Sequence, residues 1–141
     1  MIEKYPNQVR IVYKNFPIRS HKYSELAAKA ALAAQKQGKF WPFHDLLYVH
    51  YKDLSDKKIY EIANQLKLDM IRFEKDRKDP SIAEKVRTDL RDGNSAGVRG
   101  VPTVFINGRS LRNRSLEGFS KMIEKELQKA GNPSPQKITP K

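Results

Sequence analysis

Cysteine is absent from the 141 residues of this chain. Its absence excludes disulfide bonds, thiolate metal sites and a nucleophilic thiol within the chain. Histidine is scarce as well, and His44 and His50 are six residues apart, so one face of a helix does not present both of them. His21 follows a short loop, where a surface or capping role suits it better than proton transfer. We therefore predict no metal site, no cofactor and no catalytic residue.

Long apolar runs are also missing. No stretch approaches the roughly 18 apolar residues that a membrane span needs. The segment Met1–Pro6 lacks the apolar core of a signal peptide. We therefore expect neither a membrane span nor an export signal in this chain.

Charge is abundant and unbalanced: 31% of the residues are charged, and the formal net charge is +12. Such a charge favours acidic partners, namely nucleic acid, an anionic membrane or an acidic protein surface. A basic surface also keeps a small domain soluble, and we prefer this simpler explanation. Proteins that bind nucleic acid interleave aromatic with basic residues, whereas the aromatic residues here occupy helical positions typical of a core. We expect Trp41, Phe43 and His44 to pack there rather than to act in catalysis.

The most informative stretch is Gly97–Gly108. It predicts a loop, a strand over Thr103–Ile106 that follows Pro102, and a tight turn at Asn107-Gly108. A second strand is predicted over Arg109–Leu111. The bond before Pro102 is a candidate for the cis form, which the sequence does not decide.

The rest of the chain is mostly helical in pattern. The β-branched residues of Val9–Phe16 predict a strand, with both faces partly covered as in an inner strand of a sheet. Between residues 24 and 94, apolar residues recur with helical spacing. Candidate helix caps precede these stretches and the last helix: Ser24, Ser55, Asp69, Asp79 and Ser115. The proline-containing tail, 131–141, predicts disorder.

Four stretches in this order resemble the DsbA-like thiol–disulfide oxidoreductases: Glu3–Ile18, Glu25–Tyr48, Gly97–Gly108 and Ser115–Leu127. The resemblance implies an α/β fold, namely a truncated thioredoxin-like fold with an inserted all-helical subdomain. Residues 1–23 and 95–130 would form the thioredoxin-like part, and residues 24–94 the insertion.

The resemblance also implies a function that this chain does not carry out alone. In the family, a Cys-x-x-Cys motif lies at a helix N-terminus directly before the counterpart of Glu3–Ile18, and its first thiolate attacks substrate disulfides. This chain lacks that motif and the strand before it, so we expect it to be redox-inactive. Truncation and a natural cysteine-free relative both account for this, and we favour truncation. The parent function would be disulfide exchange in an extracytoplasmic compartment such as the periplasm or cell surface.

In the family, the backbone before the loop proline pairs with an extended polypeptide substrate. The matching residues here are Val101, Pro102 and Thr103, and they are our candidate substrate-binding residues. A non-catalytic module that binds a peptide or partner through this loop, or through a free strand edge, is the alternative function. A basic nucleic-acid-binding domain is the second alternative.

Two further expectations follow from departures from the family pattern. Because the missing strand would be central, its absence leaves unpaired edges, and we expect the chain to form a homodimer, re-pair its strands or fold marginally. Arginine is concentrated around the hairpin, where the family often has small or neutral residues, so an anionic partner or a solvated hairpin explains this group: Arg99, Arg109, Arg112 and Arg114.

Overall fold

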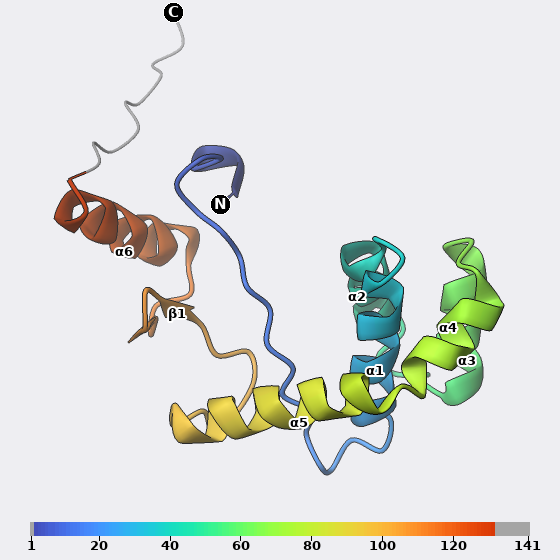
Figure 1. Cartoon of the computed structure of the whole chain (residues 1–141). Helices are drawn as coiled ribbons and strands as arrows, with labels where there is room; N and C mark the ends of the chain where they lie inside the picture. Colours follow the sequence, from blue (N-terminus) through green and yellow to red (C-terminus); the bar gives the residue numbers. More distant parts are fainter. Residues whose placement is uncertain (1, 132–141) are drawn as a thin grey trace, which may run out of the picture. The chain divides into compact units, whose positions relative to one another are not determined.

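The computed structural model describes residues 2–131, and the chain divides into two compact units (Figure 1). The helical unit is Lys14–Gly97, and the hairpin unit consists of Met1–Tyr13 with Val98–Lys141. The helical unit includes residues 24–94, for which the sequence predicts an inserted helical subdomain. The predicted disordered tail, 131–141, lies outside the described residues apart from Gly131.

The helical unit contains five helices: α1 (Ser24–Gln35), α2 (Phe40–Val49), α3 (Asp56–Gln65), α4 (Met70–Arg77) and α5 (Pro80–Ser95). Helix α1 is rich in alanine and contacts each of the other four. Its small side chains let these helices approach closely, and Ala30, Ala33 and Ala34 are fully buried. Phe43 of α2 and Phe73 of α4 fill the centre of this core, with ring centroids 5.7 Å apart.

Three of the predicted caps in this unit form as expected. The side chains of Ser55, Asp69 and Asp79 accept hydrogen bonds from backbone N–H groups in the first turns of α3, α4 and α5. The prediction for Ser24 is wrong, because α1 begins at Ser24 itself. Its hydroxyl instead donates to the carbonyl of Ile18, 2.9 Å away, and so ties the preceding loop to the helix.

The hairpin unit contains a 3₁₀ turn, η1 (Ile2–Lys4), a two-stranded sheet and α6 (Leu116–Lys129). Its small core is formed by Tyr5, Ile123 and Leu127, against which Val9 and Ile106 pack. The Tyr5 hydroxyl donates to Glu124 Oε1 at 2.9 Å, which fixes the N-terminal turn on α6.

The sheet consists of β1 (Phe105–Ile106) and β2 (Arg109–Ser110), which pair antiparallel with Phe105 opposite Ser110. Both turn residues have positive φ, 46° at Asn107 and 76° at Gly108, as the predicted tight turn requires. Both strands are shorter than predicted. One backbone bond, from the Leu111 N–H to the Val104 carbonyl at 2.8 Å, continues the pairing beyond them.

The strand predicted over Val9–Phe16 does not form: this segment has no regular secondary structure, and within residues 2–131 it belongs to no sheet. A strand needs a neighbour to complete its backbone hydrogen bonds, and none of the described segments pairs with this one. The sequence predicts that both faces are partly covered, as in an inner strand. Ile11 is 49% exposed and Val12 is 61% exposed, so neither side chain is buried as in an inner strand.

Candidate functional site

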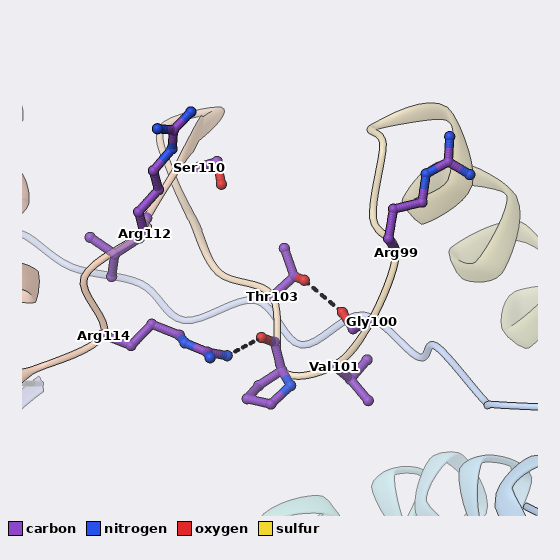
Figure 2. Close-up of a pocket in the computed structure, with 9 residues that line it drawn as sticks. Arg99, Gly100, Val101, Thr103, Ser110, Arg112 and Arg114 are labelled. Atoms are coloured by element: carbon purple, nitrogen blue, oxygen red, sulfur yellow. Dashed lines mark hydrogen bonds between the residues drawn. The ribbon is translucent and has the colours of Figure 1, made fainter.

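A pocket of about 490 Å³ lies in the hairpin unit, between the loop that leads into the hairpin and the chain that leaves it (Figure 2). The three residues predicted to bind substrate, Val101, Pro102 and Thr103, all line it. The Val101–Pro102 peptide bond is cis. The other lining residues are Arg99, Gly100, Ser110, Leu111, Arg112 and Arg114.

Two polar contacts hold this loop in place, and Figure 2 shows both as dashed lines. The Thr103 hydroxyl donates to the Gly100 carbonyl, 2.6 Å away. The Arg114 guanidinium, from the segment that follows the hairpin, donates to the Pro102 carbonyl. Between these contacts, the backbone N–H and carbonyl of Val101 form no hydrogen bond with any of residues 2–131. The loop therefore presents an exposed length of backbone with free hydrogen-bonding capacity.

The structure separates the four arginines that the sequence groups together. Arg99, Arg112 and Arg114 line the pocket, whereas Arg109 forms an ion pair with Glu126 of α6 at 3.3 Å. Hydrogen bonding from Lys129, with a smaller contribution from Arg109, holds the pKa of Glu126 below its ordinary value. Glu126 therefore stays ionised near neutral pH and keeps Arg109 engaged away from the pocket.

The pocket offers guanidinium, hydroxyl and backbone groups. Its nine lining residues include the hydroxyls of Thr103 and Ser110 but no carboxylate, imidazole or thiol that would activate them. Within the described residues, no cluster of three or more histidine, aspartate or glutamate side chains has an arrangement that would hold a metal ion. Among the same residues, no helix has both the length and the apolar character to cross a membrane.

The aromatic candidates lie in the helical unit, on α2. Phe43 is fully buried, as predicted, but Trp41 is 47% exposed, so its assignment to the core is wrong. The reason is helical geometry: Phe43 occupies the inward face of α2, and a residue two positions away points elsewhere. His44 is half-buried, and its ring lies 4.8 Å from that of Tyr48. His21 is exposed in the turn before α1, as expected.

Sequence reasoning did not place six of the nine lining residues in the pocket: Gly100, Ser110, Leu111, Arg99, Arg112 and Arg114. It grouped the three arginines only as part of a basic hairpin. The signal for Ser110 and Leu111 was present in the turn. An Asn-Gly turn fixes the register of the hairpin, and this register sets residues 110–111 opposite residues 104–105.

Comparison with known proteins agrees with this architecture. A sequence profile of the thioredoxin family, described as "Thioredoxin", matches residues 1–125. A thioredoxin-like oxidoreductase of known structure from Silicibacter pomeroyi superposes with a TM-score of 0.68 at 24% identity, over 84% of this chain and 68% of that one. At this identity the likeness shows the fold, a thioredoxin-like arrangement of mostly helices and a small sheet.

Two kinds of curated relative are similar in sequence. The probable disulfide bond formation protein D of Bacillus anthracis is 35% identical over 131 residues, which cover 86% of this chain and 59% of that protein. The Na(+)/H(+) antiporter NhaA 3 of Salinispora tropica is 38% identical over 102 residues, which cover 72% of this chain but 16% of the antiporter. The chain thus spans only part of the length of these relatives. The match over residues 1–125 and the shared fold together show that this chain belongs to the thioredoxin family.

Proposed function

We propose that this chain is a DsbA-like member of the thioredoxin family that binds extended polypeptide and performs no thiol–disulfide exchange of its own. One observation carries the proposal: Val101–Thr103 form the wall of the pocket and leave backbone groups unpaired there, in a chain without cysteine. Without a thiolate there is no nucleophile for a mixed disulfide.

The mode of binding follows from the unpaired backbone. An extended peptide that lies beside Val101 exchanges main-chain hydrogen bonds with it, as when a strand is added to a sheet edge. The contacts of Thr103 and Arg114 hold the loop in one conformation, which lowers the entropy lost on binding. The main-chain hydrogen bonds themselves depend little on peptide sequence.

The likeness to disulfide bond formation protein D supports the choice of polypeptide as the ligand. We further propose that the chain corresponds to the part of a DsbA-like domain that follows the dithiol segment, and that the parent domain works in an extracytoplasmic compartment. The resemblance of Glu3–Ile18 to the stretch after the dithiol helix supports this origin. An in-frame Cys-x-x-Cys sequence in the DNA just before the Met1 codon is the expected finding, and its absence there contradicts truncation.

Binding is tested by titrating the ¹⁵N-labelled chain with an extended, cysteine-free peptide. The amide signals of Val101 and Thr103 should shift, while those of the helical unit should not. Thr103→Val, which removes the hydroxyl that donates a hydrogen bond to the Gly100 carbonyl, should weaken binding. Thr88→Val, at a half-buried position of α5 in the helical unit, should not. Absence of any shift in the Val101 amide would refute the proposal. Insulin reduction above background would refute the claim that the chain is redox-inactive.

A further inference from the structure

The guanidinium groups of the pocket have no acidic partner among the residues that the structure describes. Within residues 2–131, neither Arg99 nor Arg112 forms a hydrogen bond or an ion pair, and Arg114 engages only the Pro102 carbonyl. A guanidinium carries five N–H donors, so that single bond leaves most of the capacity of Arg114 unused. The chain carries many other cations, but several of them, including Arg77, Arg87 and Arg109, do pair with carboxylates.

The three side chains are arranged around one space. Figure 2 shows Arg112 and Arg99 rising on opposite sides of Thr103, with Arg114 reaching across below them. The arginines therefore flank the same length of backbone that we propose to bind polypeptide. Arg99 precedes the loop and Arg112 follows β2, so the hairpin is what brings their charges to one pocket.

We propose that this pocket selects polypeptide segments that carry aspartate or glutamate side chains. The inference rests on the proposed function, because Val101–Thr103 must first bind the peptide main chain. The arginines then bind the carboxylates of its side chains. Paired N–H groups of a guanidinium match the two oxygens of a carboxylate, and such charge-assisted bonds are stronger than neutral ones. The net charge of +12 adds long-range attraction for an acidic segment.

The chemistry of the lining favours a carboxylate-bearing peptide over nucleic acid. Strands of nucleic acid are held by stacking of bases on aromatic side chains as well as by cations. None of the nine lining residues is aromatic, and the wall between the arginines is made of Val101, Pro102 and Leu111 together with free backbone. This combination suits a peptide main chain with acidic side chains beside it.

The test compares two extended peptides that are identical except that glutamate in one is replaced by glutamine in the other. At low salt, the chain should bind the glutamate peptide roughly tenfold more tightly, and the preference should shrink as salt screens the charges. The double variant Arg99→Gln/Arg112→Gln should bind both peptides about equally. Arg19→Gln, an exposed arginine of the helical unit, serves as a control and should keep the preference.

The outcomes separate this inference from the function on which it rests. Equal binding of the two peptides by the unaltered chain refutes selection for acidic side chains but leaves polypeptide binding intact. Binding of neither peptide refutes both. If a single-stranded oligonucleotide of equal charge displaces the glutamate peptide and is itself lost from the double variant, the pocket is a phosphate site, and the proposal is overturned.

Discussion

The carboxylate of Asp89 accepts hydrogen bonds from both the backbone N–H and the side-chain amide of Asn15, at 3.1 and 2.9 Å. Both residues are buried, with exposed fractions of 1% and 4%. Lys85 binds the other oxygen of the carboxylate at 2.5 Å, and Lys14 lies 3.3 Å from it. One buried side chain of α5 therefore anchors the beginning of the helical unit by satisfying donors that have been removed from water.

Replacing Asp89 by alanine should destabilise the helical unit by about 3 kcal/mol. The substitution leaves two buried donors of Asn15 without an acceptor, and it removes a carboxylate that pairs with Lys85 and Lys14. Denaturant unfolding followed by circular dichroism measures the change. Asp92→Ala is the matched control, because Asp92 lies on the same helix but is exposed, and among residues 2–131 it pairs only with Lys14. Its loss should cost under about 1 kcal/mol. Equal losses in the two variants would contradict the anchoring role.

The same site predicts a dependence of stability on pH. Burial raises the pKa of Asp89, but hydrogen bonds from Lys85, Asn15 and Lys14 outweigh burial and hold the pKa below its ordinary value. The folded state therefore binds this proton less readily than the unfolded state, in which the carboxyl has its ordinary pKa of about 3.9. The stabilisation is fully present above that pH and is lost as the pH falls through the lower folded value.

Measured against pH, the difference in unfolding free energy between the unaltered chain and Asp89→Asn should be constant near neutrality and should shrink below about pH 4. The comparison isolates Asp89 because the other carboxylates titrate in both proteins. A difference that stays constant down to the acid limit of folding would show that the bonds to Asn15 and Lys85 do not depend on the charge of this carboxylate.

Gly118 in the first turn of α6 should not tolerate even one added carbon. A Cβ at this position would collide with the backbone oxygen of Asn113, so the loop before the helix would have to move. Alanine in a helix is usually favoured over glycine by about 1 kcal/mol, but overpacking against backbone costs about 1–3 kcal/mol. We expect Gly118→Ala to lower stability by about 1 kcal/mol or more. At Gly100 nothing lies within 4 Å of an added Cβ, so Gly100→Ala should change stability by less than about 0.5 kcal/mol.

A structural feature could be predicted from the sequence when the residues that interact to form it are close together in the chain. The caps at Ser55, Asp69, Asp79 and Ser115 bond to N–H groups two or three residues away, so the local sequence contains the whole signal. The turn at Asn107-Gly108 is equally local, because positive φ at both residues is a property of those residues. Most of the helical fold and the centre of the pocket follow from such signals.

The failures involve partners that are distant in the sequence. The β-branched residues of Val9–Phe16 favour an extended backbone, but a strand also needs a neighbour that no local pattern reveals, and the segment has no regular secondary structure. The sequence also grouped four arginines that the structure separates, and the reason is similar. Side chains alternate faces along a hairpin strand, which separates Arg109 from Ser110 and Arg112, yet only the position of Glu126 on α6 decides that Arg109 turns away from the pocket.

The segment Val9–Phe16 also predicts self-association. The side chains of Ile11 and Val12 are exposed, and within residues 2–131 their backbone groups form no hydrogen bond. An unpaired apolar edge of this kind is a template for strand addition, and a second copy of the chain offers the same edge. Sedimentation should therefore show a dimer that becomes more populated with concentration. Val12→Lys should weaken it, because a charged residue on an edge opposes pairing, whereas Val49→Lys at the exposed end of α2 should not. A monomer at every concentration, or equal weakening by both substitutions, would mean that this edge does not associate.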